Sequence, residues 1–84
     1  MFKMKVKDIF FIGDKVILAG DLKTDLKNIK KLSCRLLVNG NPHSNLLIEG
    51  EVFSRGARDL WTKSKVSLSR NTLENNEITL IPTE

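Results

Sequence analysis

The chain has few side chains of the kinds that catalyse reactions or bind metal ions. It holds one histidine, His43, and one cysteine, Cys34. A zinc site needs three or four protein ligands, so we expect no metal. A Ser-His-Asp triad would have to use His43, which lies in the turn-like segment NGNPHSN, and no serine sits in a small-residue elbow. We therefore expect a solvated His43, and a buried, inert thiol at Cys34 in the apolar run LSCRLLV.

Two carboxylates, Glu49 and Glu51, have a spacing that acid–base chemistry could use. On a strand they share one face, and a glycosidase needs such a pair beside a sugar-binding cleft. A chain of 84 residues has little room for a cleft, so we expect a charged solvent face with Lys or Arg neighbours. The five glycines are scattered rather than gathered into a phosphate loop. The sequence thus predicts no enzyme and no cofactor.

Cationic residues are the remaining candidates for contact with a partner. The net charge is +4, and the first 35 residues hold nine Lys or Arg against four Asp, which favours weak attraction to polyanions. Lys3, Lys5 and Lys7 would project from one strand face, where they either contact phosphates or protect a strand edge. The alternative to partner binding, for these lysines and for the basic residues around the tryptophan, is a solvated Lys-rich surface that contacts nothing.

A second basic group surrounds the single tryptophan. Its members lie in a predicted irregular loop over residues 54–62 and in the residues that follow it. They are Arg55, Arg58, Trp61, Lys63 and Lys65. Trp61 would either stack on a nucleic-acid base or cover the open end of a small barrel.

Alternating apolar residues and turn signals predict the elements that carry these groups. Lys3–Ile12 and Lys15–Leu22 should pair across Gly13-Asp14, because glycine accepts the positive φ of a tight hairpin. The first strand either ends covered on both faces at its IFFI end, with Phe10 in the core, or is rotated midway by a bulge. The further strands are predicted at Leu32–Val38, Leu46–Phe53, Lys65–Ser69 and Ile78–Ile81.

The connections follow from the same signals. Asn39-Gly40 is a strong turn signal, and residues 41–44 should extend that turn because proline cannot continue a central strand. Gly20 and Gly50 mark bulges or close backbone approaches. Residues 23–32 form either a short helix or, as we prefer, a loop whose Leu26 and Ile29 pack on the barrel. Residues 71–77 form a turn.

These elements predict an all-β fold, a small closed or partly open six-stranded antiparallel β-barrel that makes residues 1–84 one domain. The longest apolar run falls far short of the ~20 residues of a membrane helix. The N-terminal segment MFKMKVKDIF also lacks the features of a signal peptide. We therefore expect a cytoplasmic protein with no membrane contact.

The order of these segments resembles the second, β-barrel domain of translational GTPases such as elongation factor Tu. The similarity covers residues 5 to 82 and rests on apolar patterning and glycines in VKDIFFI, KVILAGDL, NIKKLSCRLLVNG, LLIEGEVFS and KVSLSRNTLENNEITLIP. The chain departs from a complete factor because it has no P-loop, and Thr62-Lys63-Ser64 replaces the family's small-residue pair. The resemblance implies contacts with RNA or neighbouring domains, and Arg55 and Arg58 occupy the region of the family's tRNA-facing loop.

The sequence therefore predicts a non-catalytic, stand-alone binding module that contacts RNA or a ribonucleoprotein. The alternative is a protein-interaction or structural module whose partner pairs with a strand edge. The candidate partner-binding residues are Arg55, Arg58, Trp61, Lys63, Lys3, Lys5 and Lys7.

Overall fold

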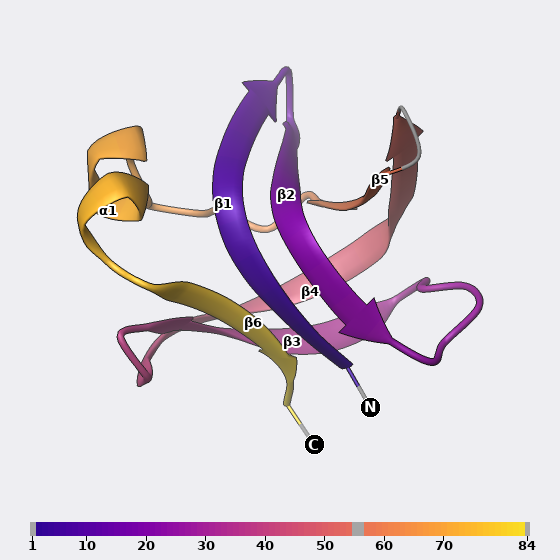
Figure 1. Cartoon of the computed structure of the whole chain (residues 1–84). Helices are drawn as coiled ribbons and strands as arrows, with labels where there is room; N and C mark the ends of the chain where they lie inside the picture. Colours follow the sequence, from indigo (N-terminus) through magenta and orange to yellow (C-terminus); the bar gives the residue numbers. More distant parts are fainter. Residues whose placement is uncertain (1, 55–56, 84) are drawn as a thin grey trace.

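The computed structural model of the chain describes residues 2–54 and 57–83. In these residues six strands follow one another around a closed ring in the order β1-β2-β5-β4-β3-β6 (Figure 1), and every neighbouring pair is antiparallel. The predicted six-stranded antiparallel barrel is confirmed. The elements are β1 (Phe2–Ile12), β2 (Lys15–Thr24), β3 (Leu32–Val38), β4 (Asn41–Ser54), β5 (Ala57–Thr62), α1 (Arg70–Asn75) and β6 (Ile78–Pro82).

Alternation along the strands places one face of each inside the ring. In β1 the side chains of Phe2, Met4 and Val6 are buried while the lysines between them are exposed. Two segments outside the strands complete the core, because Ile29, Val66 and Leu68 are also buried. Full burial of a Leu or Ile side chain contributes about 1.5–3 kcal/mol relative to an exposed one. The core is therefore shared between the sheet and its connections.

A bulge in β1 reverses which residues face the core. The register with β2 shifts between Val6 and Asp8, so that Ile9 is buried after an inward-facing Val6. Of the two possibilities for this strand, the bulge is the one observed. Phe10 then points outward and is 38% exposed, so the prediction that Phe10 belongs to the core is wrong.

Gly20 lies opposite this bulge, where the two backbones approach closely. A Cβ atom on Gly20 would lie 1.9 Å from the carbonyl oxygen of Lys5, a distance that no side chain can tolerate. Gly50 marks a second irregularity, a register shift between Ile48 and Gly50 in the pairing of β4 with β5. Both glycines predicted to mark a bulge or a close approach are confirmed in that role.

The two predicted hairpin turns are present. Gly13 has a φ of 60°, and Asn39 and Gly40 both have positive φ, at 51° and 83°. However, β4 begins at Asn41, so residues 41–44 do not extend the turn as predicted. Pro42 is accommodated because this end of β4 pairs only with β3, whereas its pairing with β5 begins at Ile48.

The region after β4 differs most from the prediction. Residues 57–62, expected to be irregular, form β5, with Leu60 and Thr62 facing inward and Trp61 outward. The expected strand Lys65–Ser69 is not a strand, although its alternating Val66 and Leu68 do point into the core. Alternation there reflects burial of one side of an extended connection, without a hydrogen-bonded partner strand.

The predicted turn over residues 71–77 is largely a helix. Ser69 caps α1, since its side-chain oxygen accepts a hydrogen bond from the backbone N–H of Thr72 at 3.2 Å. In the loop over residues 25–31, Ile29 is buried as predicted, but Leu26 is 41% exposed, so its predicted packing on the barrel is wrong.

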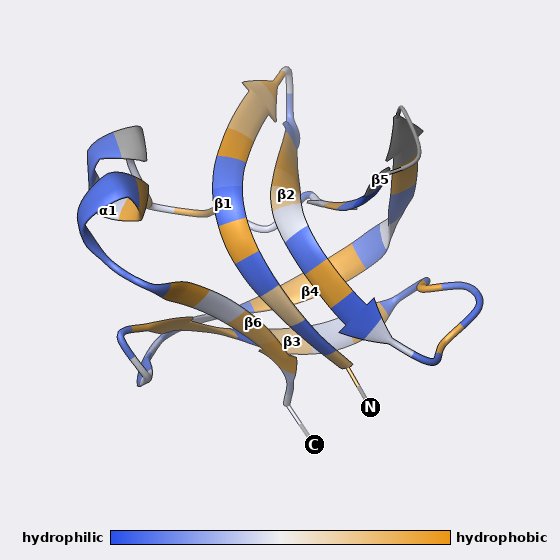
Figure 2. Ribbon diagram, in the orientation of Figure 1, coloured by the Kyte–Doolittle hydropathy of each residue, from blue (hydrophilic) through white to orange (hydrophobic). Residues whose placement is uncertain are grey.

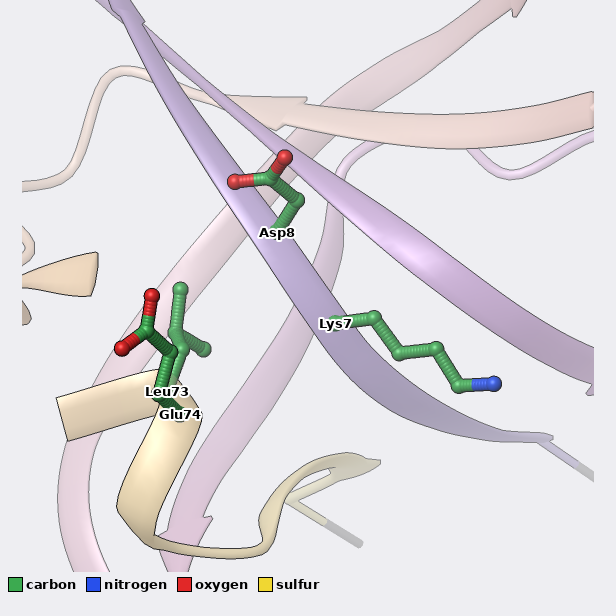
Figure 3. Close-up of a pocket in the computed structure, with 4 residues that line it drawn as sticks. All are labelled: Lys7, Asp8, Leu73 and Glu74. Atoms are coloured by element: carbon green, nitrogen blue, oxygen red, sulfur yellow. The ribbon is translucent and has the colours of Figure 1, made fainter. Parts of the chain in front are cut away.

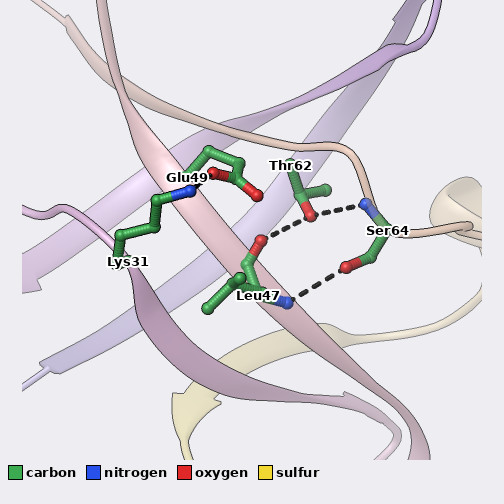
Figure 4. A network of polar contacts seen from close by, with 5 residues as sticks. All are labelled: Lys31, Leu47, Glu49, Thr62 and Ser64. Carbon is green, nitrogen blue, oxygen red and sulfur yellow. Dashed lines mark hydrogen bonds and ion pairs between the residues drawn. The ribbon is translucent and has the colours of Figure 1, made fainter.

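A hydrogen-bond network fixes the exit from β5 against β4 (Figure 4). The Thr62 hydroxyl donates to the carbonyl oxygen of Leu47 at 2.7 Å and accepts from the backbone N–H of Ser64 at 3.0 Å. The Ser64 hydroxyl in turn accepts from the N–H of Leu47 at 3.1 Å. Because Thr62 is fully buried, these bonds satisfy a polar group that would otherwise destabilise the core.

Candidate functional site

The outer face of the β1–β2 hairpin carries a cluster of positive charge. Lys3, Lys5 and Lys7 of β1 are all exposed, as predicted for one strand face. The register sets Lys3 directly opposite Lys23 of β2, and Lys5 opposite Asp21. A hollow of about 220 Å³ is lined by Lys3, Lys5, Asp21 and Lys23. We call Lys3, Lys5, Lys7, Asp21 and Lys23 the lysine face.

One carboxylate interrupts the lysine face. The Lys7 ammonium lies 2.9 Å from Asp21 Oδ2 in an exposed ion pair. Figure 3 shows Lys7 reaching away from Leu73 and Glu74 of α1, so its charge belongs to the β1–β2 face. Lys7 lowers the pKa of the Asp21 carboxyl below its ordinary value through a hydrogen bond and its charge, and Lys23 and Lys5 lower it further. Three cations thus act on one anion.

The opposition of Lys3 and Lys23 is unfavourable for the isolated domain. Like charges directly opposite each other on a sheet destabilise it, by an amount of the order of 0.2–1 kcal/mol for such cross-strand pairs. A bound anion between them would remove that repulsion. The sequence did not predict the part played by Lys23, because the bulge in β1 decides which residue Lys3 faces.

In the second predicted group, the side chain of Arg58 is engaged within the domain. The Arg58 Nε donates to Glu51 Oε1 at 2.6 Å, and Nη2 donates to the carbonyl oxygen of Leu26 at 3.0 Å. Glu51 also accepts the backbone N–H of Ile29 at 2.9 Å. The Arg58 guanidinium lowers the pKa of Glu51, and Glu51 raises that of Arg58. Arg58 therefore ties the loop to the barrel, and Arg55 lies outside the described residues.

Glu49 and Glu51 each have a basic neighbour, as expected. Lys31 pairs with Glu49, an ion pair drawn in Figure 4, and Arg58 pairs with Glu51. Both carboxylates are thus engaged in ion pairs that hold the loop and β5 to β4. Among the described residues no three His, Cys, Asp or Glu side chains gather as metal ligands would.

Trp61 lies on the outer side of β5 and does not close an end of the barrel. It is paired with Ile17 of β2 on one side and Gly50 of β4 on the other. Gly50 makes room for the indole, because a Cβ atom there would lie 3.0 Å from Trp61 Nε1. The Lys15 ammonium lies 4.9 Å from the centre of the indole ring, a cation–π contact. The predicted covering role is wrong, and stacking on a base stays a prediction.

The predicted site residues therefore divide between two parts of the surface. The structure brings Lys3, Lys5 and Lys7 together, whereas Lys63 and Lys65 are exposed in the connection after β5. Trp61 borders a groove of about 510 Å³ between β4 and the loop over residues 25–31.

No helix in the described part of the chain has the length and apolar character to cross a membrane. Comparisons with protein-family models, curated proteins and solved structures give no match to this chain.

Proposed function

We propose that this domain is a non-catalytic binding module that holds RNA, alone or in a ribonucleoprotein, through the lysine face. The observation that carries the proposal is the direct opposition of Lys3 and Lys23 across β1 and β2, beside a hollow lined by a third lysine. Such an arrangement costs stability without a ligand and is relieved by a phosphate.

Two further parts of the proposal come from the sequence. The domain would be a stand-alone, cytoplasmic version of the second domain of translational GTPases. The similarity at KVSLS does not support this part of the proposal, because residues 65–69 do not form the strand that the family has at this place. The lysine face is independent of that similarity.

The alternative, a partner that adds to a strand edge, has less support. Each strand in the ring has two neighbouring strands, so strand addition would have to use a partial edge, such as residues 41–47 of β4 or residues 19–24 of β2, which pair on one side only. Cation clusters also bind acidic proteins, so the test must distinguish that partner from RNA.

Salt dependence tests the proposal. Binding of a fluorescent RNA of about 10 nucleotides is measured by anisotropy between low and moderate salt. The slope of log K against log salt is about −0.7 for each phosphate contact with a single strand. Replacement of Lys3 and Lys23 by Gln should weaken binding at low salt and flatten the slope by about 1.4.

A matched control removes the same charge elsewhere. Lys27→Gln with Lys30→Gln also lowers the net charge by two, at exposed positions in the loop over residues 25–31 and outside the lysine face. The proposal requires a smaller loss for this control. Equal losses for the two double variants, or no RNA binding by the wild type at low salt, would reject the lysine face as the site.

A further inference from the structure

An apolar row crosses the outside of the barrel next to the lysine face. Phe10 of β1 is in register with Ile17 of β2, and Ile17 with Trp61 of β5. All three side chains point outward, because the residues that alternate with them, Ile9, Leu18 and Leu60, are buried. We call Phe10, Ile17 and Trp61 the aromatic row.

The end of β1 exposes further apolar surface near this row, Ile12 on the same face as Phe10 and Phe11 on the opposite one. Phe11 and Ile12 are 58% and 59% exposed. Figure 2 shows the hydrophobic colour continuing to the tip of β1, whereas hydrophobic and hydrophilic residues alternate nearer its start. These side chains do not serve the core. Exposed apolar surface of this kind marks an interaction site more often than an isolated exposed residue does.

Positive charge borders the row on two sides. Lys15, the cross-strand partner of Ile12, holds its ammonium over the Trp61 ring. In the other direction along the hairpin, Lys5 lies five residues before Phe10, about 16 Å at the rise of a strand. Both groups are on the outer face of the same two strands. This combination of aromatic faces with flanking cations complements a ligand that has both phosphates and accessible bases.

We propose that the ligand of this surface is single-stranded nucleic acid whose bases stack on the aromatic row, with one base replacing the Lys15 ammonium over Trp61, while its phosphates contact the lysine face and the displaced Lys15. Neighbouring strands lie about 4.8 Å apart, so Phe10 and Trp61 present two platforms separated by Ile17. A duplex keeps its base faces inside its own stack and cannot use them. This inference rests on the proposed function and specifies the form of nucleic acid bound.

The single tryptophan makes the proposal directly measurable, because Trp61 is the only one in the chain. Stacking of a base should quench and shift its fluorescence when an unstructured oligouridine of about 10 nucleotides binds. The same titration is made with a duplex RNA of equal length and with heparin, which offers negative charge without bases. We expect quenching by oligouridine alone, and weaker binding of the duplex at moderate salt.

Substitution separates stacking from charge. Phe10→Ala should weaken oligouridine binding about 5- to 150-fold and leave heparin binding unchanged. Leu47→Ala is the control, since Leu47 is exposed to the same degree, 39%, but lies on β4. Urea unfolding of each variant shows that the comparison is made on folded protein.

The outcomes separate the two proposals. Equal binding of duplex and oligouridine without quenching would overturn the single-strand inference and leave the lysine face intact. Absence of binding to all three polyanions would overturn both. Association with anionic lipid vesicles but not with oligouridine would assign the exposed apolar residues to a membrane and also overturn both.

Discussion

Replacement of Glu51 by Gln tests whether one carboxylate holds the loop over residues 25–31 to the barrel. The Glu51 side chain is only 4% exposed, and its two oxygens accept from Arg58 Nε at 2.6 Å and from the Ile29 N–H at 2.9 Å. A glutamine of the same shape has one oxygen and one NH2 group. Whichever way the amide turns, one of the two donors meets another donor, so one hydrogen bond is lost.

The expected cost follows from that loss. A hydrogen bond to a charged group contributes about 1.5–3 kcal/mol, and the Arg58 side chain is 30% exposed, so water replaces part of the interaction. We expect Glu51→Gln to lower the free energy of unfolding by about 1.5–2 kcal/mol. For a domain of this size, this corresponds to a fall in Tm of about 6–16 °C.

The cost should depend on pH. Arg58 lowers the pKa of the Glu51 carboxyl below its ordinary 4.5, so the ionised form is favoured by folding. The stability that this contributes is complete above pH 4.5 and is lost as the pH falls through the lowered pKa of the folded state. The difference between wild type and Glu51→Gln should therefore narrow in acid.

Urea unfolding at pH 7 and at several values below 4.5 measures both effects. Glu74→Gln on the exposed surface of α1 is the control, and it should change stability by less than about 0.5 kcal/mol. A Glu51→Gln effect as small as that of the control at pH 7 would refute the role of the hydrogen bonds. An effect of the same size at every pH would refute the role of the charge.

Three other predictions concern the core and the strand pairing. Gly20→Ala should lower the unfolding free energy by more than about 2 kcal/mol, because its Cβ would overlap the Lys5 carbonyl; an unchanged urea midpoint would contradict the close approach. Leu80→Ala, at a fully buried position, should cost about 2–5 kcal/mol in the same assay, and a cost below that range would show an imperfectly packed centre. Burial raises the pKa of the Cys34 thiol to about 11, so a thiol reagent at pH 8 should label it only in denaturant; rapid labelling of the native protein would refute its burial.

Local signals in the sequence were sufficient for much of the fold. The boundaries of β3 and the turns at Gly13 and Asn39-Gly40 depend on period-2 alternation and on residues that accept positive φ, and the structure agrees with both. β5 was missed and residues 65–69 were wrongly assigned as a strand. Alternation reports which side chains are buried, whereas a strand also needs a hydrogen-bonded neighbour from elsewhere in the chain.

The candidate surface was harder to predict because it depends on a single bulge. Counting back from the turn, with Ile12 opposite Lys15, an uninterrupted hairpin would place Lys3 opposite Thr24. The shift between Val6 and Asp8 instead places Lys3 opposite Lys23. The same shift sets Phe10 on the outside. The contacts of Arg58 were also hard to predict, because they depend on how the chain folds: Glu51 lies on the neighbouring strand β4 and Leu26 lies in a loop 32 residues earlier.

The position of β6 in the ring has a consequence for how this protein is made. β6 lies between β1 and β3, yet it is the last of the six strands to leave the ribosome. Until it is in place, the backbone groups of β1 and β3 that β6 covers remain open to another chain, and unpaired edges promote aggregation. Pairing between the first and last strands also has a high contact order, which slows folding. We expect premature termination before Ile78 to yield aggregating chains, because β6 is the strand that covers these backbone groups of β1 and β3.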